Sequence, residues 1–127
     1  MNNGSVAIRL LVFVLILITA CNKPEPNEPP QPCISGPWYE GSGGYGDYLE
    51  TELGTPLSLS ASCSADADLD TLTARWDWNA DGTWDTYYIS IQATVNNQYP
   101  DTGWYELVLS VDDGKEAKLK SARVHIK

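Results

Sequence analysis

A run of alternating apolar and polar side chains, from Leu72 to Trp78, limits the fold of this chain more than any other feature. Apolar residues stand at every second position, and polar residues fill the positions between them. Successive side chains of a β-strand point to opposite faces, so this period predicts a strand with one buried face. Trp76 and Trp78 both lie on the apolar phase, which requires a core that can cover them.

The same alternation recurs along the chain and predicts an all-β protein. No segment after Cys21 repeats its apolar residues with the period of a helix. Turn residues separate the alternating runs, most clearly at Tyr99–Gly103 and at the hairpin turn Asp112–Lys115. Short strands at this spacing favour an antiparallel, immunoglobulin-like β-sandwich. The predicted strands are 57–63, 72–78, 84–88, 89–95, 104–111 and 117–126.

Two side-chain directions follow from the same patterns. Cys63 takes an inward position at the end of the strand 57–63. In the last strand the apolar phase changes between Leu119 and Ala122. A bulge adds one residue to a strand and changes its phase, so we expect a bulge near Ser121. The inward residues of this strand are then Ala117, Leu119, Ala122, Val124 and Ile126.

Residues 1–20 are predicted to be a lipoprotein signal peptide. The apolar run Leu10–Ile18 has the length of a signal-peptide core, whereas a membrane-spanning helix needs about 20 residues. Ile18-Thr19-Ala20-Cys21 resembles a bacterial lipobox, so we expect Cys21 to carry lipid. The alternative is an ordinary signal peptide with a chance cysteine. Lipid on Cys21 would anchor the chain to the bacterial envelope, and Asn22 favours the outer membrane or cell surface.

Residues 21–32 are predicted to join this lipid to one domain, residues 33–127. Five prolines stand among residues 22–32, and none of these residues is a large apolar one. Such a composition favours an extended spacer of about 3.1 Å per residue. The remaining chain is large enough for one hydrophobic core and too small for two.

Charge and cysteine content limit the function. Asp and Glu number 17 against 8 Lys and Arg, a net charge of −9, which disfavours nucleic acid as a partner. Export places Cys33 and Cys63 in an oxidising compartment, so they are predicted to form a disulfide; two free thiols are the alternative. The carboxylate pair Asp66 and Asp68 would need an enclosed pocket to act as a catalyst. We therefore expect no enzymatic activity and no required cofactor.

Two stretches resemble the PKD domain family. One contains Trp76-Asp77-Trp78, and the other runs from Tyr99-Pro100 to Asp112-Asp113. The resemblance implies an immunoglobulin-like sandwich, common in bacterial surface proteins and secreted enzymes as a spacer or binding module without catalytic activity. It also implies that Trp76 packs beside Cys63. Two segments depart from the family pattern: the lengthened turn after Trp78 and an insert at about residues 36–53.

The lengthened turn carries a candidate calcium loop. Side-chain oxygens recur at alternate positions around Gly82, which is the ligand spacing of loops that wrap calcium. Tyr88 stands where such loops have a bidentate Glu, so we expect an affinity of about 10⁻⁴–10⁻³ M. The alternative is a turn in which Asp and Asn side chains cap their own backbone. The candidate ligands are Asp77, Asn79, Asp81, Thr83 and Asp85.

The Gly- and Tyr-rich insert supplies candidate partner contacts. Exposed aromatic rings offer large, rigid contact surfaces to sugars and proteins. The alternative is that the insert folds back and covers an open sheet edge. Lys118 and Lys120, on the last strand, could likewise guide a partner or protect that edge. The candidate protein or glycan contacts are Trp38, Tyr39, Tyr45, Tyr48 and, on the outward phase of its strand, Trp104.

These features predict a non-catalytic, lipid-anchored module of the bacterial envelope that contacts a protein or a glycan. The alternative is a purely structural role, as a calcium-stiffened spacer or as a subunit of an envelope assembly.

Overall fold

The computed structural model describes residues 24–127. The predicted signal peptide and the predicted lipidation at Cys21 lie outside these residues. Within 24–127 every regular element is a β-strand. No helix in this range is long and apolar enough to cross a membrane.

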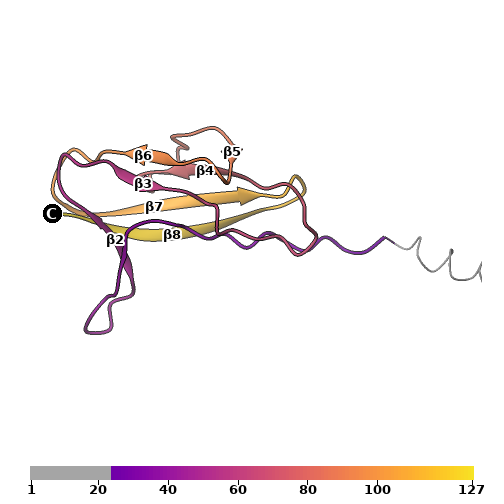
Figure 1. Ribbon diagram of the computed structural model, residues 1–127, viewed down its shortest axis with the longest axis horizontal. Helices are drawn as coiled ribbons and strands as arrows, with labels where there is room; N and C mark the ends of the chain where they lie inside the picture. The colour runs from indigo at the N-terminus through magenta and orange to yellow at the C-terminus, as the bar shows by residue number, and fades with distance from the viewer. Residues whose placement is uncertain (1–23) are drawn as a thin grey trace, which may run out of the picture.

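The strands form two sheets that face each other (Figure 1). The larger sheet has the order β1-β2-β8-β7-β4-β5, and β3 pairs with β6 in the smaller sheet. All pairs are antiparallel except β2 and β8, which run parallel. The predicted all-β sandwich is therefore confirmed, with one parallel pair added. The strands are β1 (Trp38–Tyr39), β2 (Tyr48–Thr51), β3 (Leu57–Leu59), β4 (Thr73–Asp77), β5 (Ile89–Ser90), β6 (Val95–Asn97), β7 (Gly103–Asp112) and β8 (Ala117–Ile126).

The core lies between the sheets and is built from the inward phase of each strand. Trp76 on β4 is fully buried, as predicted, and Trp78 packs on it with ring centroids 5.6 Å apart. Tyr99 fixes this end of the core because its hydroxyl donates to the carbonyl of Trp78 at 2.7 Å. The largest fully buried side chains are Trp76, Leu49, Leu57, Leu59, Leu107, Leu109, Val111 and Val124.

The last strand contains no bulge, so the prediction near Ser121 is wrong. Residues of β8 pair one to one with β7, from Asp112 opposite Ala117 to Gly103 opposite Ile126. Leu119 therefore faces outward and is 64% exposed. Lys118 and Lys120 take the inward phase, which is tolerated because the strand here extends past the edge of the core. The prediction was wrong because it assumed that the whole length of the last strand covers the hydrophobic core, whereas only the part from Ala122 to Ile126 does.

Other predicted strands are shorter than expected. β3 ends at Leu59, and residues 84–88 form no strand. The predicted strand 89–95 is interrupted by a turn in which the N–H of Ala93 donates to the carbonyl of Ser90. Only its two ends pair, as β5 and β6, and they belong to different sheets.

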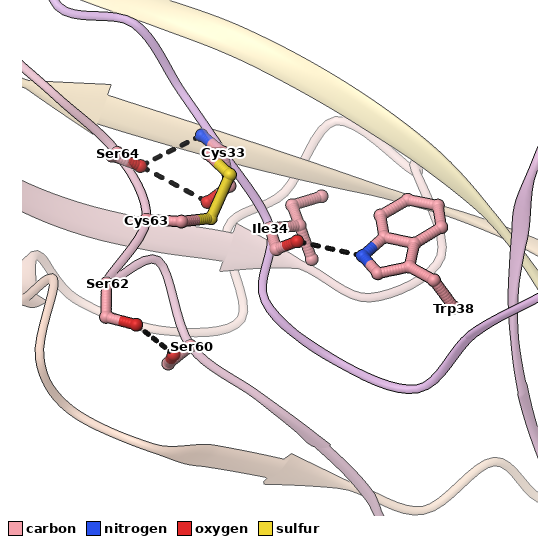
Figure 2. Close-up of a disulfide and its surroundings, with 7 residues drawn as sticks. All are labelled: Cys33, Ile34, Trp38, Ser60, Ser62, Cys63 and Ser64. Carbon is pink, nitrogen blue, oxygen red and sulfur yellow. Dashed lines mark hydrogen bonds between the residues drawn. A yellow bond between two sulfur atoms is a disulfide. The ribbon is translucent and has the colours of Figure 1, made fainter.

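Cys33 and Cys63 form the predicted disulfide, with Cα atoms 5.3 Å apart (Figure 2). The Ser64 hydroxyl strengthens the same connection because it accepts from the N–H of Cys33 at 2.9 Å and donates to its carbonyl at 3.2 Å. Cys63 lies in a turn after β3 and is exposed, so its predicted inward position is wrong. The bridge joins this turn to the segment that precedes β1.

The proline-rich segment differs from a free spacer over its last residues. The backbone of Gln31 bonds to that of Ala65 in both directions, at 2.8 and 3.1 Å. The N–H of Glu28 donates to Asp68 at 2.7 Å, and Pro30 is buried. The ordered domain thus begins before Cys33, because prolines without N–H groups can still pack along a loop edge.

Candidate functional site

The insert extends the larger sheet beyond β8. β1 and β2 form a hairpin in which Tyr39 lies opposite Tyr48. β2 then runs along β8, with Glu50 beside His125. In Figure 1 the loop between β1 and β2 projects away from the body of the molecule. The insert therefore covers part of a sheet edge, which was the alternative expected from the sequence. It also leaves an aromatic loop exposed.

Gly41 shapes this loop. A Cβ atom at Gly41 would collide with the backbone carbonyl oxygens of Tyr45 and Gly46. The chain therefore doubles back more closely than any other residue permits. Gly43 and Gly44 complete the turn with φ of 67° and 84°.

Aromatic rings of the insert and of the outer face of the larger sheet, which is the face turned away from the core, meet at β2, β7 and β8. Trp104 stacks on His125, its cross-strand neighbour, at 4.4 Å between ring centroids. Tyr48 meets Trp104 edge-on at 5.1 Å, and Tyr39 stacks on Tyr48 at 6.1 Å. Arg123 places its guanidinium carbon 4.7 Å from the Trp104 ring centroid.

An open hollow of about 450 Å³ lies beside these rings, and we call it the insert groove. Its lining combines aromatic surface, hydroxyl groups, one guanidinium, one imidazole and one carboxylate, a set that suits a polar ligand with flat apolar faces. The lining residues are Gly41, Ser42, Tyr45, Tyr48, Glu50, Trp104, Arg123 and His125.

A second hollow of about 710 Å³ adjoins it and shares Tyr45 and Arg123. Trp38 lines this second hollow. Figure 2 shows the Trp38 indole, whose Nε1 donates to the carbonyl of Ile34 at 2.8 Å. Because that bond fixes the ring, the exposed face of Trp38 is held in place without a partner.

Glu50 fixes the position of His125, and both residues line the insert groove. Its two carboxylate oxygens lie 2.9 Å from His125 Nδ1 and 2.8 Å from Lys127 Nζ. Hydrogen bonds from Lys127 and then His125 hold the pKa of the Glu50 carboxyl below its ordinary value. The carboxylate therefore stays ionised and orients the imidazole that stacks on Trp104.

Three of the five predicted contact residues line the insert groove: Tyr45, Tyr48 and Trp104. Trp38 lines the adjoining hollow, and Tyr39 stacks on Tyr48 without lining either hollow. Sequence reasoning missed Glu50, Arg123 and His125. The available signal was the outward phase that Arg123 and His125 share on β8, which places them on the same sheet face as Trp104 on β7.

The candidate calcium loop caps its own backbone. The Asp77 carboxylate accepts from the N–H groups of Asp81 and Gly82, at 3.3 and 2.9 Å. Asp85 accepts from the N–H of Trp78 at 2.7 Å, and Asp81 from the N–H of Thr83 at 2.8 Å. Asn79, with its amide nitrogen turned to the carboxylates, donates to Asp77 at 3.1 Å. These contacts match the alternative of a self-capping turn.

A smaller aromatic site, absent from the predictions, lies beside this loop. Arg75 is held between Trp84 and Tyr88, with its guanidinium carbon 4.3 and 4.5 Å from the ring centroids. A hollow of about 400 Å³ opens there, and Tyr87 beside it is 92% exposed. The Arg75 guanidinium already occupies the ring faces, so this site offers less free aromatic surface than the insert groove.

Comparison with known proteins identifies relatives of the fold. A family model described as PKD domain matches residues 45–127. The chain is similar to the PKD domain of an M14-like peptidase from Thermoplasmatales archaeon SCGC AB-540-F20, at 17% identity and TM-score 0.54, over 80% of this chain and 98% of that one. A search of curated proteins finds no match.

A second similar structure is a nucleoside hydrolase-related hypothetical protein from Saccharophagus degradans that is associated with carbohydrate metabolism. The identity is 28% and the TM-score 0.51, over 80% of this chain. The match spans only 26% of that protein, so it concerns one part of a larger molecule.

Proposed function

The chain belongs to the PKD domain family, and from this premise we propose that it is a non-catalytic envelope module that binds a glycan through the insert groove. PKD domains are in general non-catalytic surface or interaction modules. The finer assignment rests on the part of this chain that the family pattern does not explain, which is the insert.

The preformed ring cluster is the observation that carries the proposal. Trp104 is 55% exposed although its ring is fixed by His125 and Arg123. Fixed aromatic surface lowers the entropy lost on binding, and this favours weak polar ligands such as sugars. The Arg123 guanidinium adds hydrogen-bond donors for sugar oxygens, whereas Glu50 in the lining and the net charge of −9 disfavour an acidic glycan.

The setting of the groove agrees with a membrane anchor. In Figure 1 the described chain begins at the end of the molecule opposite the insert loop. With lipid on Cys21, the insert groove would point away from the bilayer and towards material outside it. The carbohydrate association of the Saccharophagus degradans protein gives further, indirect support.

A structural role is the second candidate. Pairing of β2 with β8 protects the sheet edge at Leu49–Thr51, and edge protection is a sufficient reason for a short added hairpin. This candidate accounts for β2 but gives no role to the exposed rings of Tyr45 and Trp104.

A glycan array that includes both neutral and acidic polysaccharides tests the proposal. The wild-type chain is expected to bind a small set of glycans, and Trp104→Ala is expected to lose that binding. Tyr87→Ala removes an even more exposed ring that lines a different hollow, and it is expected to bind as the wild type does. Equal binding by Trp104→Ala, or no binding by the wild type, would contradict the proposal.

A further inference from the structure

Three carboxylates converge at the end of the molecule away from the insert groove. Among residues 24–127, Asp66, Asp70 and Asp113 alone form a group of acidic side chains with ligand oxygens within 4.8 Å of one another. They come from the loop after β3 and from the turn that joins β7 to β8. In Figure 1 that turn lies where the N-terminal segment reaches the body.

Two buried oxygen atoms at this place lack a donor. Asp66 is only 8% exposed, and its Oδ2 has no hydrogen-bond partner among the described residues. Its Oδ1 is already used, because it accepts from the N–H groups of Asp68 and Asp70. Asn27 Oδ1 is likewise buried without a donor within residues 24–127, while its Nδ2 donates to Asp113 at 2.9 Å. Buried acceptors in folded proteins almost always have a partner, which can be a protein donor, a water molecule or a cation, so these two oxygens are available to a bound ion.

The charges point the same way. Asp113 accepts from the amide of Asn27 and from the N–H groups of Lys115 and Glu116, and these bonds fix its carboxylate in the cluster with Asp66 and Asp70. Lys115 Nζ lies 3.2 Å from Asp70 and is the only side-chain cation paired with the cluster in the described structure. Its side chain is 59% exposed, so it can swing into water and leave the carboxylates to another cation.

We propose that Asn27, Asp66, Asp70 and Asp113 form a binding site for a divalent cation, best suited to calcium. Carboxylate and amide oxygens are hard ligands, and calcium takes six to eight of them at about 2.3–2.6 Å. Two oxygens on one such ion lie at most about 5 Å apart, which agrees with the spacing of the three carboxylates. Water completes the coordination. The candidate loop Asp77–Asp85 lies at the other end of β4 and differs from this site, because among the described residues it has no buried carboxylate oxygen that lacks a donor.

The ion would fasten the N-terminal segment to the sandwich. Asn27 stands three residues before the buried Pro30, in the segment that leads to the predicted lipid. An ion shared between Asn27 and the two loops therefore shortens the free part of the spacer. Calcium binding would make the height of the domain above the membrane depend on calcium concentration outside the cell.

Calorimetric titration of the chelator-treated full chain with CaCl₂ tests the site, with thermal unfolding as a second readout. The wild type is expected to bind one ion with an affinity of about 10⁻⁴–10⁻³ M or tighter and to melt at a higher temperature in calcium. Asn27→Ala and Asp66→Asn are each expected to weaken binding by roughly tenfold or more, because the first removes a ligand oxygen and the second removes a negative charge. Asp81→Asn, in the other loop, is the matched control and is expected to bind like the wild type.

Lys115→Gln is expected to bind calcium more tightly, because it removes the competing cation. Near-ultraviolet circular dichroism verifies that Asp66→Asn is folded; Asn27 lies outside both sheets, so its variant tests the site even if Asp66→Asn fails to fold. No heat and no thermal shift in the wild type would overturn the proposal. So would wild-type binding in Asn27→Ala, or loss of binding in Asp81→Asn alone.

Discussion

At the scale of single residues, the outer sheet face is ordered by one buried carboxylate. Glu50 bonds to His125 and Lys127, and His125 in turn stacks on Trp104. Neither Glu50 nor His125 stood out in the sequence, because their proximity depends on the parallel pairing of β2 with β8. Asn27 did not stand out either, because 86 residues separate it from its partner Asp113 in the sequence.

The lowered pKa of Glu50 predicts a loss of stability in acid. A carboxyl whose pKa is lower in the folded state stabilises the fold above its unfolded value of 4.5, and this contribution disappears as the pH falls through the folded value. In Glu50→Gln the free energy of unfolding should therefore fall less steeply below pH 4.5 than in the wild type. Urea unfolding between about pH 3 and pH 7 measures both slopes. Identical slopes would show that Glu50 has no such role.

At the scale of elements, regular alternation predicted the central strands well and the edges poorly. β4 and β7 were found within a residue or two of their predicted bounds because both of their ends lie over the core. β8 broke the rule at Lys118 and Lys120, where the strand leaves the core. The hairpin β1–β2 has too few residues for any period to be read, and only its register with β8 defines it.

Gly41 gives a prediction about the insert alone. Gly41→Ala should open the loop, because its Cβ would meet two backbone carbonyl oxygens, whereas Gly46→Ala meets nothing within 4 Å. The loop is exposed and contributes little to the core, so neither variant should shift the melting temperature by more than a few degrees. Hydrogen exchange of residues 40–47 should rise in Gly41→Ala only. Equal exchange in both variants would show that the close turn is not needed.

The disulfide gives a prediction about stability. Cys33 and Cys63 close a loop of 30 residues, which in the chain-entropy model stabilises the fold by about 3–4 kcal/mol. The double variant Cys33→Ser, Cys63→Ser avoids a free thiol and should lose about that amount in urea unfolding. A loss below about 1 kcal/mol would mean that the Ser64 bonds and the bridge of Gln31 to Ala65 hold the segment without the disulfide.

At the scale of the whole molecule, two features occupy opposite ends of the same strands. Trp104 and His125 pair near one end of β7 and β8, and Asp112 and Ala117 pair at the other. Ten strand residues at about 3.3 Å each separate the insert groove from the acidic cluster by about 30 Å. If the groove and the acidic cluster act as we propose, each can therefore be altered without the other. The β-sandwich between them could be predicted from the alternation of apolar and polar residues. The insert groove and the acidic cluster could not, because each is formed by segments that are distant in sequence.

Whether the insert is the contact surface is decided by binding of Gly41→Ala and Gly46→Ala to a glycan array, beside the wild type. Both variants add one methyl group to the loop that lines the insert groove, but only the methyl group at position 41 would force the loop open. We expect Gly46→Ala to bind the same glycans as the wild type and Gly41→Ala to lose them while its sandwich stays folded. Retention of the full binding profile by Gly41→Ala would contradict the account and would move the contact surface to the sandwich itself.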